Sequence, residues 1–290
     1  MQDAQCPSHS QGALRCFRGY EQSSWLCALA ERNHAVRILC IGDIVGKAGT
    51  EYIEQRLWGI RKLVGADFVI ANGENASPGN GLLPADAKRL HTAGVDVLTS
   101  GNHIWNRKEV YPLLDGADNL LRPHNYPTAP GSGVGVYKTP YGRVEVINLI
   151  GLTYLSPLPC PFRTADALLS QTDGAAVRIV DFHAEATSEK RAMGFYLDGR
   201  VTAVVGTHTH VQTADEQILP GGTAYITDLG MTGPVDSVIG VGKEEVLHYF
   251  LTGLPVRFQP GAGEVLLCGV LIEADMATGR ALSIERIQIK

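Results

Sequence analysis

Metal-capable side chains recur in short blocks along the chain, each directly after an apolar run. Two carboxylates, two amides and several imidazoles form an oxygen and nitrogen donor set without a thiolate. Such donors suit manganese, iron, zinc or similar ions, and seven donor side chains exceed what one tetrahedral zinc ion requires. The sequence therefore predicts two metal ions bridged by a carboxylate. The candidate ligands are Asp43, Glu74, Asn75, Asn102, His183, His208 and His210.

The elements that must position these donors alternate between strands and helices. Helical patterns separate short apolar runs that polar or Gly residues bound. This alternation predicts an α/β architecture with much parallel pairing, in which strand ends share one edge of a sheet and place the donors together. The strands are expected at Val36–Ile41, Asp67–Ala71, Val95–Thr99, Val177–Phe182 and Val201–Val205. The helices are expected at Thr50–Val64, Ala85–Ala93 and Thr187–Leu197.

Two further strand pairs make the predicted sheet mixed. Val134–Lys138 and Val144–Leu149 flank a turn and form a hairpin candidate, and Glu264–Glu273 with Ala281–Ile289 form a second antiparallel pair. Glycines at positions 42, 73, 101 and 206 suit tight exits from the strands that precede the donors.

Each donor also has a structural interpretation when taken alone. Asp43 or Asn102 would serve as a turn or helix-cap residue, and His183 as a hydrogen-bonded structural histidine. His208 and His210 stand two residues apart, so both side chains point to the same side of an extended segment. The joint occurrence of all the donors in one ordered series favours the metal site.

The ordered blocks GDIVG, NGENA, SGNHIW, DFHAE and GTHTH resemble those of the calcineurin-like metallophosphoesterases. Val45 stands where many members carry a histidine, and Glu74 stands where an aspartate commonly bridges. These variants are similar to the YmdB-like bacterial branch, which is associated with hydrolysis of 2′,3′-cyclic nucleotides. The segments Asn125–Pro127 and Asp228–Pro234 also match that branch, and the resemblance covers residues 36–290.

The resemblance implies a fold and a role for each donor. The fold is an α/β sandwich of two mixed β-sheets flanked by helices. His103, next to a ligand but not one itself, faces the scissile phosphate and serves as the catalytic acid. One metal ion is held by Asp43, Glu74, Asn75 and His210, and the other by Glu74, Asn102, His183 and His208, so Glu74 bridges them.

The expected activity is hydrolysis of 2′,3′-cyclic nucleotides or related phosphodiesters by in-line attack of a metal-bound hydroxide. Two divalent ions, the carboxylates of Asp43 and Glu74 and one hydroxide leave about one positive charge, which matches a singly charged diester. The cofactors are expected to be two divalent or mixed-valence ions, iron or manganese. Two alternatives stay open: a phosphomonoesterase or nucleotidase, and a regulatory metal protein that binds nucleotides or RNA ends.

The bulk properties restrict the remaining functions. The 290 residues are 44% hydrophobic and 19% charged with a net charge of −5, an ordinary globular balance without a long basic run. We therefore expect a small nucleotide or phosphodiester substrate, no duplex nucleic acid and no membrane partner, and a homo-oligomer is allowed. No CxxC pair is present, and a cytoplasmic location is expected.

The chain divides into a short extension and one domain. Residues 1–35 are rich in Ser, Gln, Arg and Cys without a sustained period, which predicts a disordered extension or a mis-assigned start. The metallophosphoesterase domain is expected at residues 36–290. The segment Gly42–Lys47 lacks the spacing of a phosphate-binding loop, and Gly131–Gly135 lacks that of a dinucleotide fold.

Overall fold

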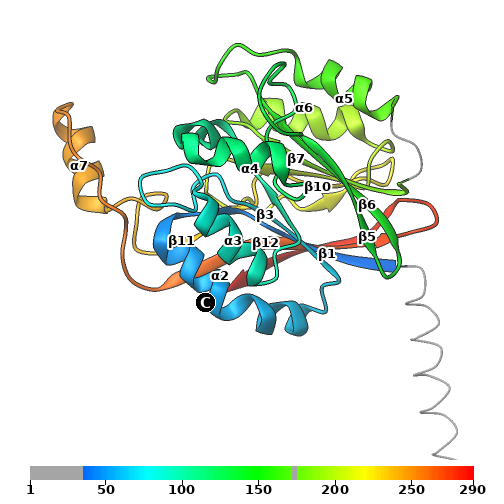
Figure 1. Cartoon of the computed structure of the whole chain (residues 1–290), viewed down its shortest axis with the longest axis horizontal. Coiled ribbons are helices and arrows are strands. Elements are labelled where there is room, and N and C mark those ends of the chain that lie inside the picture. Colours follow the sequence, from blue (N-terminus) through cyan, green and yellow to red (C-terminus); the bar gives the residue numbers. More distant parts are fainter. Residues whose placement is uncertain (1–34, 172–174) are drawn as a thin grey trace, which may run out of the picture.

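The computed structural model describes residues 35–171 and 175–290, which form two β-sheets packed face to face (Figure 1). The first sheet has the order β2-β11-β12-β1-β3-β4, with β13 paired to β12. Its strands are β1 (Ala35–Ile41), β2 (Asp43–Ile44), β3 (Phe68–Asn72), β4 (Val97–Thr99), β11 (Met231–Pro234), β12 (Val265–Asp275) and β13 (Ala281–Ile289).

The second sheet has the order β5-β6-β7-β8-β10-β9. Its strands are β5 (Val134–Thr139), β6 (Gly142–Ile150), β7 (Val177–His183), β8 (Ala203–Thr207), β9 (Gln217–Ile218) and β10 (Ala224–Ile226). Both sheets are mixed. The pairs β1–β3, β3–β4, β6–β7 and β7–β8 are parallel, whereas β1–β12, β12–β13 and β5–β6 are antiparallel.

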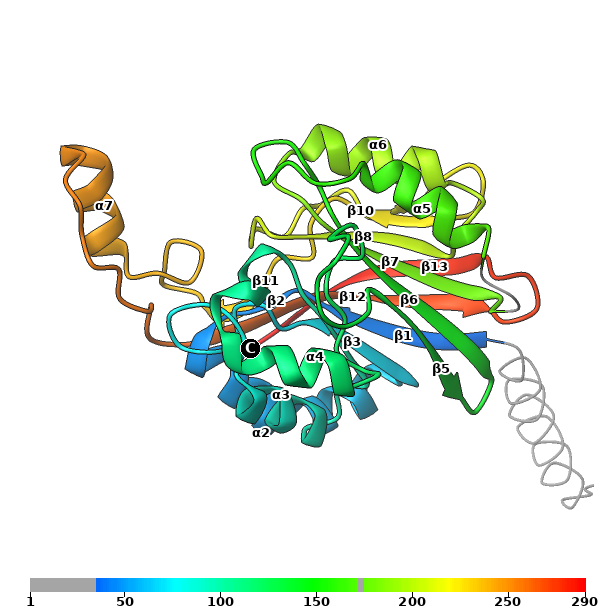
Figure 2. The same cartoon turned by 45° about the horizontal axis from the view of Figure 1, so that its top comes forward.

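Helices cover the outer face of each sheet (Figure 2). Helices α2 (Gly46–Val64), α3 (Pro84–Thr92) and α4 (Tyr111–Gly116) lie on the side of the first sheet, and α5 (Pro161–Leu169) and α6 (Thr187–Leu197) lie over the second. Two 3₁₀ turns, η2 (Asn102–Asn106) and η3 (Lys108–Val110), precede α4, and α7 (Lys243–Thr252) projects away from the body. Within the described residues, no helix is long and apolar enough to span a membrane.

Three apolar layers hold this arrangement together, and β1 shows how. Ile38 and Cys40 belong to the core between the two sheets, whereas Leu39 and Ile41 face the core that α2 and α3 cover. Because β1 is buried on both faces, its sequence is a nearly continuous apolar run rather than an alternating one. A third core lies between the second sheet and the helices α5 and α6.

The predicted fold class is confirmed, with one correction and several omissions. The five donor-bearing strands do not share one sheet edge: β1, β3 and β4 lie in the first sheet, and β7 and β8 in the second. Parallel pairing within each sheet satisfies the same sequence pattern, so the pattern does not distinguish one sheet from two. The sequence analysis did not predict the helices α4, α5 and α7 or the short strands β2, β9, β10 and β11. The predicted extension, residues 1–35, lies outside the described residues apart from Ala35, which begins β1.

Candidate metal centre

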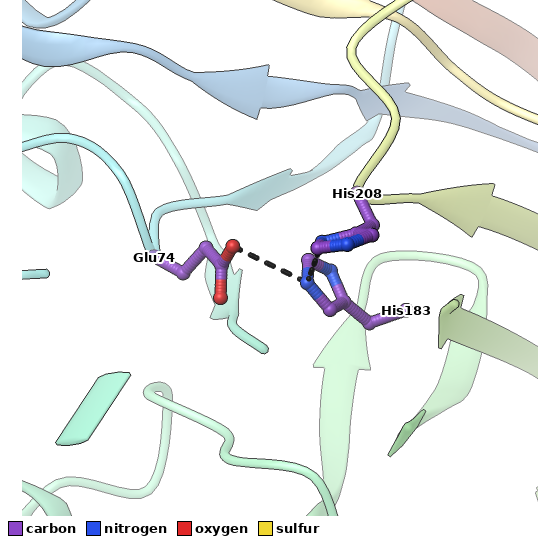
Figure 3. A group of neighbouring side chains, drawn as sticks. All are labelled: Glu74, His183 and His208. Carbon is purple, nitrogen blue, oxygen red and sulfur yellow. Dashed lines mark hydrogen bonds and ion pairs between the residues drawn. The ribbon is translucent and has the colours of Figure 1, made fainter. Parts of the chain in front are cut away.

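The carboxyl ends of strands from both sheets meet at one site. Glu74 and Asn75 follow β3, and Asn102 begins the turn η2 after β4. His183 is the last residue of β7 and pairs with Thr207, the last residue of β8. This register places His208, the residue after Thr207, beside His183. Figure 3 shows that the side chains of Glu74, His183 and His208 point toward one another.

Three atoms that could serve as metal ligands lie close to one nitrogen of His183. Its Nε2 lies 3.0 Å from Nδ1 of His208, 3.1 Å from Oδ1 of Asn102 and 3.2 Å from Oε1 of Glu74. A ring nitrogen carries at most one proton, so hydrogen bonds cannot satisfy all three contacts. Converging lone pairs on buried imidazole and carboxylate groups are the arrangement that a bound cation satisfies. The donor set therefore fits a metal ion.

The second group of predicted ligands lies on the other side of Glu74. Oδ1 of Asp43 is fully buried without a hydrogen-bond partner among the described residues, and it lies 3.7 Å from Nε2 of His210. Nδ2 of Asn75 lies 3.3 Å from the same nitrogen and 3.1 Å from Oε1 of Glu74. An orphaned buried carboxylate oxygen is costly unless a cation compensates it. Coordination by Asn75 through oxygen requires its amide to rotate by about 180°.

Hydrogen bonds outside the cluster fix which nitrogen of each histidine faces it. Nδ1 of His183 lies 2.9 Å from Oγ1 of Thr207, which in turn donates to Asp181 at 2.7 Å. Nε2 of His208 lies 3.0 Å from a carboxylate oxygen of Glu185. Each partner holds the proton on the outward nitrogen and leaves the inward one free as a ligand, the usual arrangement around protein metal sites.

His210 is fixed in the same way from a different part of the chain. Its Nδ1 lies 2.9 Å from the carbonyl oxygen of Ile239, which accepts the proton, and Nε2 is therefore left toward Asp43. The carbonyl lies in the segment that leads to α7, so this segment supports one wall of the site.

The electrostatics keep both carboxylates ionised. Burial by itself raises the pKa of Glu74, but His183 and His103 outweigh it and hold the pKa well below its ordinary value. Burial likewise opposes ionisation of Asp43, and the neighbouring His210 still lowers the pKa of that carboxyl. Burial and the adjacent His183 lower the pKa of His208 to about 4, so this imidazole is a neutral donor at neutral pH.

The loop that carries His208 and His210 corrects one step of the sequence analysis. The two residues are not in an extended segment: their φ angles are +99° and +64°, in the left-handed region. Both side chains nevertheless reach the site, because the turn redirects the chain after β8 ends at Thr207. Such angles are costly for residues with a side chain and persist only where the surroundings hold them.

The glycines that precede the donors are required by close packing. A Cβ at Gly101 would lie 2.2 Å from Nε2 of His183 and 2.5 Å from Oε2 of Glu74. A Cβ at Gly42 would lie 2.0 Å from the carbonyl oxygen of Gly230. Neither glycine has a positive φ angle, so space rather than backbone freedom is the reason for glycine here.

His103 lies at the rim of the cluster. Its Nδ1 is 2.8 Å from Oδ1 of Asn75, and its backbone N–H donates to Oε2 of Glu74 at 2.9 Å. The side chain is 31% exposed, in contrast to the fully buried Glu74 and His183. The contact through Nδ1 leaves Nε2 available for a bound molecule.

The sequence analysis missed the residues that support the donors. Asp181 and Glu185 stand two residues before and after His183 within the block DFHAE, so a search for carboxylates at this spacing would have found them. Two arginines hold loops through backbone carbonyls: the Arg122 guanidinium donates to the carbonyls of Pro123 and His124, and Arg107 donates to carbonyls of the loop at 78–80.

The two-sheet fold and the oxygen and nitrogen donor cluster place the chain among the phosphoesterase-type proteins. The fold is similar to the solved structure of a novel phosphatase from Mycoplasma pneumoniae, with a TM-score of 0.82 and 37% sequence identity. The match covers 88% of this chain and 93% of that one. A hypothetical protein from Thermus thermophilus also has a TM-score of 0.82, with 42% identity over 88% of this chain and 99% of that one.

Closer comparison defines the family. Residues 39–287 match the family model described as YmdB-like protein, so the chain belongs to that family, as its sequence blocks predicted. The chain is also 48% identical over 256 residues to the 2′,3′-cyclic-nucleotide 2′-phosphodiesterase of Bacillus subtilis (strain 168). That match covers 88% of this chain and 97% of the Bacillus protein.

Proposed function

We propose that this protein is a hydrolase that cleaves phosphodiesters, with 2′,3′-cyclic nucleotides as its substrates, at a centre of two metal ions. The observation that carries the proposal is the convergence of His208, Asn102 and Glu74 on Nε2 of His183. The activity of the Bacillus subtilis relative supports the choice of substrate. Iron or manganese suits the mixed oxygen and nitrogen donors.

In this proposal the seven donors divide into two sets that share Glu74. Glu74 is suited to the shared position because its carboxylate contacts His183 on one side and Asn75 on the other. Bound ions would supply positive charge for the phosphate and would lower the pKa of water from about 15.7 to about 7. The first set is Asp43, Glu74, Asn75 and His210, and the second is Glu74, Asn102, His183 and His208.

The protein's own groups have two tasks in the reaction. The buried carboxylates of Asp43 and Glu74 would partly offset the positive charge of the bound ions, so that a singly charged diester would be attracted. Once the Asn75 amide has rotated for coordination, its Nδ2–H would donate to Nδ1 of His103. Nε2 of His103 would then carry the proton and donate it to the departing sugar oxygen as the phosphorus–oxygen bond breaks. Water adds to phosphorus and the product is a nucleoside monophosphate. The cytoplasmic location and the absence of a duplex nucleic acid partner stay predictions.

The test compares turnover of a 2′,3′-cyclic nucleotide, a linear diester and a nucleoside monophosphate by metal-depleted protein with and without added Mn²⁺ or Fe²⁺. We expect Mn²⁺- or Fe²⁺-dependent cleavage of the cyclic nucleotide, and chromatography of the 2′- and 3′-monophosphates identifies the broken bond. His183→Ala should abolish turnover, whereas His91→Gln, on α3 and outside the site, should not. Faster release of phosphate from the monoester would favour a phosphomonoesterase, and binding without any turnover would favour a regulatory protein.

A further inference from the structure

The histidine loop, residues 208–210, rests against a buried ion pair. Nζ of Lys190, on α6, lies 2.6 Å from Oδ2 of Asp228, and the two side chains are 1% and 0% exposed. Taking two charges out of water is costly, and a well-packed apolar pair of similar volume is often as stable or more so. The stability of the fold is therefore not a sufficient reason for a lysine and an aspartate at these positions.

The carboxylate of Asp228 holds the histidine loop at its middle residue. Its Oδ2 accepts hydrogen bonds from the backbone N–H of Thr209 at 3.1 Å and from the Thr209 hydroxyl at 2.7 Å. Thr209 lies between His208 and His210, whose φ angles of +99° and +64° are unfavourable for residues with a side chain. The two hydrogen bonds hold the backbone between these strained residues, and both imidazoles depend on that backbone for their position.

The other oxygen of Asp228 reaches the strand end that carries Asp43. Its Oδ1 accepts the N–H of Gly230 at 2.8 Å, and the carbonyl of Gly230 accepts the N–H of Asp43 at 3.1 Å. The backbone N–H of His208 donates in turn to Oδ2 of Asp43 at 3.1 Å. One carboxylate thus links the histidine loop, which follows the second sheet, with the Asp43 strand end of the first sheet.

The main chain around Asp228 is fixed to the same region. The N–H of Asp228 donates to the hydroxyl oxygen of Thr213 at 3.0 Å, and the N–H of Thr213 donates to the carbonyl of Asp228 at 3.1 Å. The N–H of the following Leu229 donates to the carbonyl of Gly206 at 2.8 Å. Because its backbone is held on both sides, Asp228 is a rigid support from which its carboxylate can position other groups.

The stem of Lys190 accounts for a glycine at the end of β8. A Cβ at Gly206 would lie 1.8 Å from the carbonyl oxygen of Thr227 and 3.0 Å from Cδ of Lys190. Gly206 has no positive φ angle, so space is again the reason for glycine. The lysine stem packs against the backbone of β8 just before His208, and its ammonium group reaches Asp228.

We propose that Lys190 and Asp228 are positioning residues, which hold the histidine loop and the Asp43 strand end in the geometry required for metal binding. The ammonium group compensates the buried charge of the carboxylate, and the carboxylate holds Thr209 and Gly230 through charge-assisted hydrogen bonds. Neither residue of the pair is one of the predicted ligands. The proposal rests on the proposed metal centre, so its test measures metal binding without turnover.

Calorimetric titration of the metal-depleted full chain with Mn²⁺ tests the positioning role. Lys190→Met keeps a long unbranched stem without the charge, and Asp228→Asn keeps the shape of the side chain without the charge. Each should weaken the Mn²⁺ affinity by about 10–100-fold, the usual effect of removing a supporting partner. Thr209→Ala removes one donor and leaves the ion pair intact, so its loss of affinity should be smaller.

The double variant of Lys190→Met and Asp228→Asn tests whether the two residues act as a unit. It should bind Mn²⁺ about as weakly as Asp228→Asn alone, because the lysine acts only through the carboxylate. Losses of affinity that multiply in the double variant would show that Lys190 acts independently of Asp228, and the proposed role of the lysine would be wrong.

A second buried ion pair supplies the matched control. Oε2 of Glu145, on β6, lies 2.8 Å from Nε of Arg178, and the glutamate side chain is 0% exposed. This pair lies in the middle of the second sheet, whereas it is Ile150, at the end of β6, that pairs with His183. Glu145→Gln should therefore lower the melting temperature of the metal-depleted protein and leave its Mn²⁺ affinity unchanged.

Three results would contradict the proposal. Lys190→Met and Asp228→Asn might be folded by circular dichroism and bind Mn²⁺ as tightly as the parent, or Glu145→Gln might lose as much affinity as they do. If the ion-pair variants do not fold, Thr209→Ala decides, and parent affinity in that variant would overturn the role of the loop contact. A parent chain that binds no Mn²⁺ would instead overturn the proposed metal centre.

Discussion

His103 lies beside the donor cluster rather than within it, and this position separates catalysis from metal binding. Its Nδ1 contacts Asn75, and its side chain is partly open to solvent. His103→Ala should lower kcat by about 10²–10⁴-fold, the typical contribution of general acid catalysis. Metal content should stay near the parent value, because the predicted ligands are all retained. Steady-state kinetics together with elemental analysis measures both quantities.

A substrate with a better leaving group serves as the control for the acid role of His103. A nitrophenyl diester releases a stable anion that needs no proton, so the loss in kcat should shrink with that substrate. If His103→Ala strips a metal ion, or slows aryl and alkyl substrates equally, the residue is a ligand or a phosphate clamp and the acid role is wrong.

Single residues were also the level at which the sequence was most informative. Each of the seven predicted ligands follows an apolar run in the sequence, and their side chains lie near one another in the structure; their role as metal ligands stays a prediction. Among the supporting residues, Asp181 and Glu185 could have been found from their spacing around His183. The contacts of Asp228 with Lys190 and Thr209 could not, because only the folded structure brings these three residues together. The reason given for His208 and His210 was wrong, because backbone angles in a turn do not follow from residue spacing.

At the scale of elements, the strand ends meet closely enough to exclude even one methyl group. Gly101→Ala would place a Cβ within 2.5 Å of both His183 and Glu74, so we expect loss of metal binding and activity. Gly59→Ala, in the exposed middle of α2 with nothing within 4 Å of its Cβ, is the matched control. It should raise the free energy of unfolding by about 0.5–1 kcal/mol, because alanine favours the helix.

Metal titration and chemical denaturation of the two variants distinguish these expectations. A Gly101→Ala protein that binds metal with parent affinity would show that the strand ends can separate, and the close approach would then not be required for the site.

The loop between β4 and β5 depends on one buried cation. The Arg122 guanidinium donates to the carbonyls of Pro123, His124, Ala129, Pro130 and Gly131, and the residue is 7% exposed. Arg122→Met would leave these carbonyls unpaired, so we expect a loss of roughly 2–4 kcal/mol in the free energy of unfolding. The free energy of unfolding of Arg122→Lys should lie between those of the parent and Arg122→Met, because an ammonium group cannot reach all of the same carbonyls.

Denaturant unfolding measures this loss, and Arg163→Met, at an exposed arginine of α5, serves as the control. Equal stability of Arg122→Met and Arg163→Met would refute the role of Arg122 in holding the loop.

At the scale of the molecule, two sheets from distant parts of the chain supply one centre. Local patterns in the sequence predicted most strands and the helices α2, α3 and α6, because apolar runs and their breaks are local. The assignment of strands to two sheets depends on which apolar faces pack together, and that is not encoded in any single run. Helix α7 was missed for a related reason: it carries apolar residues on a face that none of the described residues covers.

The predicted extension can be tested on the whole chain. Every predicted ligand and each strand of the two sheets lies within residues 35–290, so removal of residues 1–34 should leave metal content and turnover close to the parent values. Thermal unfolding and turnover of the shortened protein measure this. A large fall in melting temperature or turnover would show that residues 1–34 contribute to the folded enzyme.

The metal content of the full-length chain tests the account most directly. Three atoms converge on Nε2 of His183 and a buried oxygen of Asp43 is orphaned on the other side of Glu74, so the described residues offer two adjoining sets of ligands. Elemental analysis of protein loaded with excess Mn²⁺ or Fe²⁺ and then desalted should give two ions per chain. One ion or fewer per chain under the same conditions would contradict the dinuclear centre.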